Sequence, residues 1–421
     1  MNSYTMTKII KAAAMVAAFS CSTTALADSW PTWDPETAFV PFAFSTDAMG
    51  VSVGMAGLLK GAGQPQAALL GAGVYSEKGT WLTYLGASNY IISQDSRWLF
   101  GAELFDASYK QFDYYLGEAS SNGSSVDDKV VADAKESQYR LSMRYILPLG
   151  AGESQGIRAA LMPVRKLTGH TPWESGVSSL EFRPFYQGRE FDDLPTSQIE
   201  PADFSEVEEV WGLETRFDWD NRNNTRNPTE GSQSQFSVTY DPGSSDRPSW
   251  WKWEFEQSWF WSFGNLGELF DQQILALNIY TADTPSWNST EQVNGTDTFR
   301  RPPAYAGNRL GGLYRLRSFS GGRFVDRAAM SYSMEYRVMP DWQPLEDWPV
   351  FEWYDVPWWQ WVAFVDVGRV ADEYDLAELH SDMKWSVGGA VRFQVEGIVV
   401  RTEMAWGSED SLFRVMINQP F

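Results

Sequence analysis

Cysteine is almost absent from this chain of 421 residues, and the only one, Cys21, lies near the N-terminus. The first 27 residues have the layout of a secretory signal, with two lysines before an apolar stretch and small residues ending at Ala27. We therefore predict a cleaved signal peptide at 1–27 and a mature chain, 28–421, without cysteine. Such a chain has neither disulfides to stabilise it nor thiol chemistry.

Histidine, positive charge and long apolar runs are also scarce. The two histidines, His170 and His380, lie far apart, so we expect no metal site and no histidine-based catalytic site. The lipase motif G-x-S-x-G is missing. The net charge of −22, about −24 without the two signal-peptide lysines, argues against nucleic acid as a partner. After residue 27 no run of eighteen apolar residues could form a membrane-spanning helix.

Aromatic residues, in contrast, are abundant. The chain has 21 Trp, 18 Tyr and 25 Phe, while its mean hydropathy is −0.35. Many aromatic residues without a long apolar run are typical of a closed sheet in a membrane, whose aromatic girdles lie at the two interfaces.

Residues alternate between apolar and polar over long stretches, as the strands of a membrane barrel do. In 327–339, for example, Met334 and Tyr336 share one face, and Glu335 and Arg337 share the other. A soluble β-sandwich also alternates, but its strands average five or six residues, whereas several alternations here run ten to thirteen. We interpret the inward charges as the polar wall of a wet lumen. These include Glu214, Arg216, Asp218, Glu254, Arg392, Arg401 and Glu403.

The pattern predicts sixteen strands. They are 37–45, 50–60, 66–76, 80–93, 97–117, 137–149, 156–166, 207–220, 231–242, 250–264, 268–283, 327–339, 359–371, 383–394, 397–406 and 411–421. Long connections at 118–136, 167–206 and 284–326 are expected on the outer side, and tight turns on the periplasmic side. The long segment 340–358 departs from this rule, and its aromatic residues favour a place at the membrane interface.

Short motifs in the later half resemble those of the BamA/TamA superfamily of outer-membrane barrels, the bacterial surface antigen barrel domain. "LRSF" at 316–319 is similar to the family's V/I-R-G-F/Y motif, "FVDVG" at 364–368 to F-x-D-x-G, and "EYR" at 335–337 to the strand between them. "DNRNNTRNPTEG" at 220–231 is similar to the D-x-R…P-x-x-G turn.

The resemblance implies an all-β fold, a 16-stranded antiparallel transmembrane β-barrel with a long extracellular loop that folds into the lumen. It further implies that Arg317 of this loop pairs with Asp366. Ser318 stands where the family motif has glycine. The motifs define a predicted loop-anchor set. Its members are Leu316, Arg317, Ser318, Phe319, Glu335, Arg337, Phe364, Asp366 and Gly368.

The resemblance also implies a place in the Gram-negative outer membrane and a non-enzymatic role in outer-membrane assembly, transport or envelope maintenance. The alternative is a loop-plugged channel for small solutes or lipids. We expect a barrel-only member, because the first strand begins soon after residue 27 and leaves no room for periplasmic POTRA domains. No cofactor and no metal are expected. The expected partners are outer-membrane lipids, lipopolysaccharide and the assembly machinery, with a periplasmic or homo-oligomeric partner left open.

Overall fold

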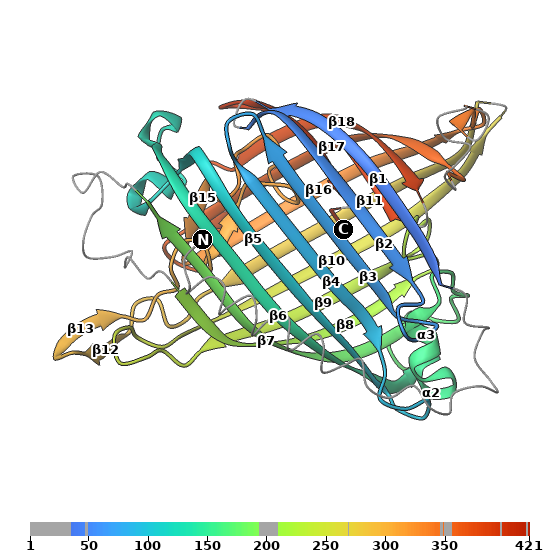
Figure 1. The fold of residues 1–421 in the computed structure, drawn as a ribbon, viewed down its shortest axis with the longest axis horizontal. Coiled ribbons are helices and arrows are strands. Elements are labelled where there is room, and N and C mark those ends of the chain that lie inside the picture. The colour runs from blue at the N-terminus through green and yellow to red at the C-terminus, as the bar shows by residue number, and fades with distance from the viewer. Residues whose placement is uncertain are drawn as a thin grey trace.

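A computed structural model describes residues 35–46, 49–192, 209–267, 269–345, 348, 356–395, 398–417 and 420–421 (Figure 1). Its main sheet has sixteen strands. They are β1 Glu36–Thr46, β2 Gly50–Lys60, β3 Ala68–Ser76, β4 Trp81–Tyr90, β5 Trp98–Tyr114, β6 Val130–Gly150, β7 Val177–Phe191, β8 Glu209–Arg222, β9 Gly231–Asp241, β10 Trp250–Leu266, β11 Phe270–Asp283, β16 Ala328–Pro340, β17 Trp359–Ala371, β18 Lys384–Val395, β19 Ile398–Gly407 and β20 Ser411–Ile417.

The strands pair in chain order, each antiparallel to the next, from β1 to β11 and on from β16 to β20. The sheet curls so that its two end strands, β1 and β20, lie beside each other. Figure 1 shows the strands tilted and wrapped around a central space. The predicted fold class, an antiparallel barrel of sixteen strands, is confirmed.

The strands alternate in burial as the sequence alternates in polarity. On β16, the side chains of Glu335 and Arg337 are fully buried, while Met334 and Tyr336 are 45% and 40% exposed. The charged face therefore points into the barrel and the apolar face points to the bilayer, which confirms the predicted faces of this strand.

One of the sixteen predicted strands is wrong. Residues 156–166 form helix α3 (Ile157–Leu161) and the start of an irregular segment, after helix α2 (Ala151–Gln155). Gly150 and Gly156 precede these helices with φ +53° and +57°, so the chain turns at both glycines instead of extending. The strand that takes its place in the count of sixteen is β7. It lies inside the stretch 167–206, which we expected to be an outer loop.

The helices in the described part of the chain are short. Besides α2 and α3 there are α4 (Leu376–Leu379) and the 3-10 turns η1 (Gly117–Ser120) and η2 (Val126–Asp128). None of them is long and apolar enough to cross a membrane.

Three stretches of interest fall partly or wholly outside the described residues. The predicted signal peptide, 1–27, is one of them, and so is most of the segment 346–355. Within 340–358, Trp342 and Trp348 are 64% and 48% exposed. Residues 418–419 are the third stretch. Beyond them, the ring of Phe421 lies 6.4 Å from that of Phe260, whose side chain points into the lumen.

Candidate functional site: a loop anchored inside the barrel

The connection between β11 and β16, residues 284–327, is the inward loop. It contains two small antiparallel pairs, β12 (Thr290–Val293) with β13 (Thr296–Phe299), and β14 (Asn308–Leu310) with β15 (Phe324–Asp326). Its apolar residues pack against the luminal wall formed by β11, β16 and β17. This cluster comprises Leu310, Leu316, Phe319 and Phe324 of the loop with Tyr280, Ala282, Ala329 and Val370 of the wall.

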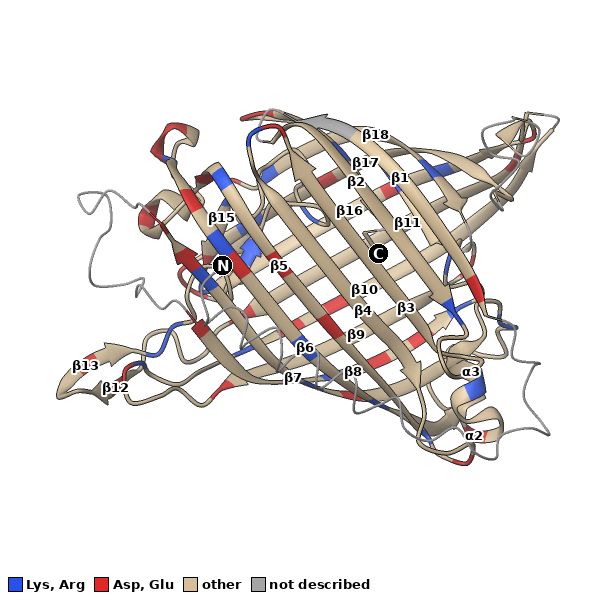
Figure 2. Cartoon of the chain, viewed as in Figure 1, with Lys and Arg blue, Asp and Glu red and all other residues tan. Residues whose placement is uncertain are grey.

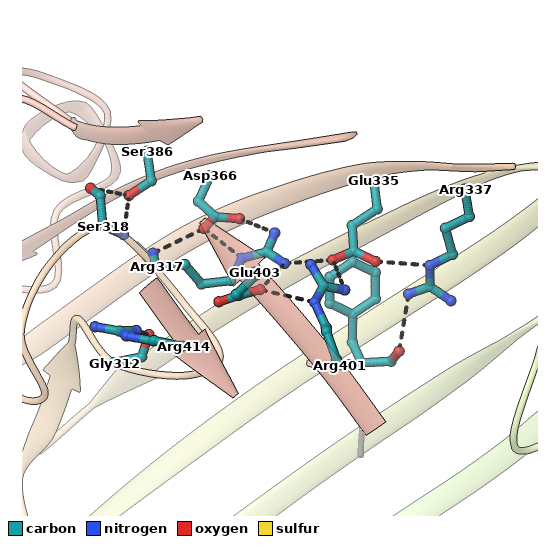
Figure 3. Close-up of polar contacts among 11 residues, drawn as sticks. Gly312, Arg317, Ser318, Glu335, Arg337, Asp366, Ser386, Arg401, Glu403 and Arg414 are labelled. Carbon is teal, nitrogen blue, oxygen red and sulfur yellow. Dashed lines mark hydrogen bonds and ion pairs between the residues drawn. The ribbon is translucent and has the colours of Figure 1, made fainter. Parts of the chain in front are cut away.

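Arg317, near the tip of the inward loop, is held by Asp366 of β17. Its Nε lies 2.9 Å from Asp366 Oδ2 and its Nη2 lies 2.7 Å from Oδ1, so the guanidinium and the carboxylate form a two-bond fork. The backbone N–H of Arg317 donates a further bond to Asp366 Oδ2 at 3.1 Å. Both side chains are fully buried (Figure 3).

A second carboxylate, Glu335 of β16, completes the cradle. Arg317 Nη1 lies 2.5 Å from Glu335 Oε1, and Glu335 also receives Arg337 Nε at 2.8 Å. Arg401 of β19 lies 2.8 Å from Glu335 and 2.8 Å from Glu403. Figure 3 shows these side chains converging from neighbouring strands. The result is a buried network of alternating charges that joins the loop to three strands.

The electrostatics favour the charged form of Arg317. Burial alone would lower the pKa of its guanidinium, but the carboxylates of Asp366 and Glu335 more than offset this effect and raise the pKa above its ordinary value. The buried guanidinium stays charged only while both carboxylates remain beside it, because an unpaired buried charge is costly.

The ring of Phe364 packs against the guanidinium group of Arg317. The guanidinium carbon of Arg317 lies 3.6 Å from the centroid of the Phe364 ring, which is within cation–π range. The ring needs the space above Gly388 on β18, because a Cβ atom there would lie 2.4 Å from Phe364 Cζ. Gly368 has a similar role, since a Cβ atom there would lie 3.0 Å from Leu310 of the inward loop.

Ser318, which replaces the motif glycine, makes contacts of its own. Its backbone N–H donates to Ser386 Oγ at 3.0 Å, and the two hydroxyls lie 2.7 Å apart. Both serines are fully buried. Leu316, just before the arginine, has φ +49°, a strained value for a side chain of this size, and it is held there by the buried cluster of the inward loop.

The serine tip predicts a specific clash. A Cβ atom at Gly407 would lie 2.0 Å from Ser318 Oγ and 2.9 Å from the Trp385 carbonyl, so Gly407→Ala should destabilise the seated loop by about 1–3 kcal/mol. We expect faster proteolysis of the inward loop in this variant. Adding Ser318→Gly should restore part of the protection. Equal protease sensitivity of the wild-type and Gly407→Ala proteins would show that the space at this position is unimportant.

The predicted anchor residues thus fall into one network, with two differences of detail. Arg337 contacts Glu335 at 2.8 Å and the carbonyl of Phe421 at 3.4 Å, so it joins the network through Glu335. Phe319 packs within the inward loop, 5.2 Å from the ring of Phe324.

Sequence reasoning missed several residues that hold the loop. Arg414 of β20 donates to the carbonyls of Gly312 and Phe319, the latter at 2.6 Å. Arg315 pairs with Glu256 of β10 at 2.7 Å, two strands away from β16 in the sheet. These residues belong to no short motif. The one available signal was charge on luminal faces, namely Arg414 on β20 and Lys252, Glu254 and Glu256 on β10.

A second clasp lies nearer the outer end of the loop. Arg323 is 1% exposed, and its Nε lies 2.7 Å from Glu409 Oε2 in the turn between β19 and β20. Its Nη1 donates to Ser124 Oγ at 2.8 Å and to the Ala119 carbonyl at 3.1 Å, both in the connection between β5 and β6. One arginine therefore ties the inward loop to two other outer loops.

Arg323→Ala should loosen this clasp while the anchor stays in place. We expect the outer part of the inward loop, near β14 and β15, to exchange its amide hydrogens at least tenfold faster, because a buried arginine loses several charge-assisted bonds. The region around Arg317 should keep its protection. Hydrogen exchange read by mass spectrometry checks this result, and uniform loss of protection through both regions would contradict two separate clasps.

The motif turn at 220–231 lies at the opposite end of the barrel. Asp220 binds Arg222 Nε at 2.8 Å and Arg165 Nη1 at 2.9 Å. Gly231, which starts β9, has φ +101° and would clash with the Asn221 carbonyl if it carried a Cβ atom. The Arg226 carbonyl of this turn accepts from Arg392 Nη2 of β18 at 3.0 Å, so the turn contacts the luminal wall.

The histidines are separated as expected. His170 lies in the connection between β6 and β7, and His380 contacts Tyr332 at 2.7 Å near the outer end of β16. Within the described ranges, no three His, Cys, Asp or Glu side chains lie close enough to hold a metal ion.

Comparisons with known proteins agree with this architecture. The family model "Omp85 superfamily domain" matches residues 94–407. CdiB from Escherichia coli aligns over 92% of this chain and 63% of its own, with 12% identity and a TM-score of 0.52. CdiB from Acinetobacter baumannii aligns over 91% of this chain and 59% of its own, with 10% identity and a TM-score of 0.50. BamA from Haemophilus ducreyi lacking POTRA domains 1–3 covers 91% of this chain and 70% of its own, with 14% identity and a TM-score of 0.49.

The likeness to the two CdiB structures shows a shared fold. No curated protein sequence matches the chain, and it spans less than two thirds of either CdiB chain. The family model, in contrast, covers well over half of the chain and includes the anchor residues and their strands. The chain is an outer-membrane β-barrel and belongs to the Omp85 superfamily.

Proposed function

We propose that this barrel is a non-enzymatic passage or assembly site in the outer membrane, closed at rest by its inward loop. The observation that carries the proposal is the buried contact of Arg317 with Asp366 and Glu335. These ion pairs hold the loop in one position. If they separate, the loop is released, so we propose that assembly or transport requires the loop to move.

The rest of the chain is proposed to serve this role as follows. Residues 1–27 direct export and are removed, and residues 28–421 form the barrel domain. Outer-membrane lipids and lipopolysaccharide surround it, and the assembly machinery inserts it. The two CdiB structures share the fold, and membership of the Omp85 superfamily supports a role in outer-membrane assembly or transport.

The test compares the conductance of the purified protein in planar bilayers with that of a variant lacking 311–324. We expect the intact protein to be mostly closed and the deletion variant to give steady, larger openings. Heat-modifiable mobility on gels must first show that both barrels are folded. An intact protein that already conducts as strongly as the deletion variant would contradict a plugged resting state.

A second candidate is a permanently open channel for small solutes. It is favoured by the luminal wall on β5–β8, where charged side chains remain in contact with solvent. The side chains of Glu103, Arg140 and Arg216 are 44%, 29% and 30% exposed. Steady solute-selective conductance in the intact protein would favour this candidate over the plugged passage.

A further inference from the structure

The luminal face of the first four strands differs from the rest of the lumen. Residues that lie directly opposite each other on neighbouring strands share a face. One such row runs from Val40 through Ala56 and Ala72 to Tyr84. Trp81 and Leu85, on the other face of β4, are 39% and 59% exposed toward the bilayer, so Tyr84 and its row face the lumen.

The rows on either side have the same character. They are Ala38, Leu58, Leu70 and Gly86 on one side, and Phe42, Gly54, Val74 and Leu82 on the other. We call these three rows, without Tyr84, the apolar wall. They extend over five residues of each strand, four steps or about 13 Å, and over four strands, about 14 Å. Because the interior of a membrane barrel is normally polar, an apolar wall on this side requires an explanation.

The outward face of the same strands is apolar too. Phe39 and Met55 are 62% and 57% exposed to the bilayer side, and Phe39 packs over Gly57 on the face opposite Phe42 and Gly54. In Figure 2, strands β2 to β4 are tan along most of their length, whereas β5 to β8 carry red and blue positions. Strands β1 to β4 are thus apolar on both faces, with the apolar wall facing the lumen and the other face toward the bilayer.

The inward loop does not cover this wall. Its apolar cluster packs on β11, β16 and β17, and its Leu313 and Tyr314 are 40% and 48% exposed. Leu58, Leu70, Val74 and Leu82 of the apolar wall all remain partly exposed. An accessible apolar surface of this kind marks a binding site.

Arginine lies at the border of the apolar wall. The row that contains Leu58 and Leu70 continues through Gly86 to Glu103 on β5 and Arg140 on β6. Arg140 Nη1 lies 3.9 Å from Glu103 Oε2, well beyond the 2.7–2.9 Å of a charge-assisted hydrogen bond. The side chain of Arg140 is 29% exposed, so part of it is open to the lumen next to Glu103.

The inward loop faces this border from the other side. Burial raises the pKa of the Tyr314 hydroxyl, Arg315 lowers it, and Glu103 of β5 raises it further. Arg183 of β7, 3.8 Å from the same Glu103 oxygen, adds a second cation. Arg183 and Arg216 also donate to Glu214 Oε1 at 3.1 and 2.9 Å. Three guanidinium groups, including that of Arg140, thus lie around two carboxylates at this border.

We infer that the lumen binds an amphiphile that has an apolar chain and an anionic headgroup, with the chain on the apolar wall and the headgroup at Arg140. This inference rests on the proposed passage and names its ligand class. Guanidinium groups bind phosphate through paired N–H donors, and the chain covers surface that would otherwise face water. A purely polar solute would leave the apolar wall uncovered, and a neutral amphiphile would not use the arginine.

The test places a dye in the mature chain, which lacks cysteine. Ala72→Cys carries an environment-sensitive dye on the apolar wall, and Tyr75→Cys carries it on the outward face, where the native tyrosine is 60% exposed. Each protein is held in amphipol and titrated with hexadecanoyl lysophosphatidylglycerol that carries a nitroxide quencher. The inward loop and Arg317 are left intact, so the result does not depend on whether the plug opens.

We expect saturable quenching at position 72, competed by unlabelled lysophosphatidylglycerol, and gradual unsaturable quenching at position 75. Arg140→Gln should raise the half-saturating concentration at position 72 about tenfold or more, because a charge-assisted contact is lost. It should leave position 75 unchanged. Glycerol phosphate alone, which has no chain, should not compete.

Three results would overturn the inference. Position 72 could behave like position 75, which would mean no luminal site. Hexadecyl maltoside could compete as well as the anionic lipid, which would mean that the headgroup charge is not recognised. Quenching at position 72 could appear only after residues 28–34 are deleted, which would mean that this segment of the chain covers the apolar wall itself. The two proposals can fail separately. If the intact protein conducts as strongly as the variant lacking 311–324 but quenching at position 72 is saturable, the plugged passage is refuted and the ligand site is supported.

Discussion

Arg317→Ala is expected to release the inward loop and open the barrel. The change leaves the carboxylates of Asp366 and Glu335 without the cation that lies 2.7 and 2.5 Å from them. Removing one partner from a buried ion pair costs about 3–5 kcal/mol. We expect protease to cut the loop near residue 317 in the folded barrel, and we expect single-channel conductance to rise.

Arg315→Ala is the matched control for this prediction. Arg315 is two residues away and also pairs with a carboxylate, but its side chain is 21% exposed and that of Glu256 is 25% exposed. Its loss should have a smaller effect on both readouts. Equal effects of the two alanine variants, or protease resistance of Arg317→Ala, would refute the anchor. The paired change Arg317→Gln with Asp366→Asn should recover part of the protection, since it removes both members of the fork.

Val387→Arg on β18 is expected to destabilise the barrel in the membrane by about 2–4 kcal/mol if the residue lies near the midplane, because the new charge faces lipid. Val387 is 40% exposed and lies opposite Val365 and Trp406 on the neighbouring strands, within the apolar outer band. Urea unfolding followed by tryptophan fluorescence in lipid vesicles would measure the loss.

Its control must place arginine on the luminal face without touching the anchor. Ser386, beside Val387, is unsuitable because its hydroxyl contacts Ser318. Gln138 on β6 lies in the luminal row between Phe105 and Gln187, and Gln138→Arg should cost clearly less than Val387→Arg. If the two variants unfold at the same urea concentration, the assignment of faces is wrong.

Much of the fold could be predicted because a barrel strand has period two and carries its own signal. Strand β7 was not predicted, for a physical reason. Pro184 lies in its middle, and proline normally argues against a central strand. The β6–β7 pairing stops at Arg140 and Phe185 and resumes at Met143 and Phe182, so the sheet is interrupted beside the proline. This gap in the β6–β7 hydrogen bonds allows a proline within the long strand β7, and no local sequence pattern reveals the gap.

The candidate site could be predicted only in part. The pair of Arg317 and Asp366 follows from resemblance to a family motif, and no spacing rule alone would have joined residues 49 positions apart. Glu403 and Arg414 come from strands that meet the loop only because the sheet curls back on itself. Their roles depend on three-dimensional closure, which a single sequence does not contain.

The sequence separation of the anchor contacts has a consequence for the order of folding. Arg317 reaches Glu335 across 18 positions and Asp366 across 49, Ser318 reaches Ser386 across 68, and Arg414 reaches Gly312 across 102. All these partners follow the loop in the chain, and contacts of long separation form slowly. The loop is therefore locked only after the last strand has joined, and the barrel passes through a stage in which its strands are paired while its lumen is still open.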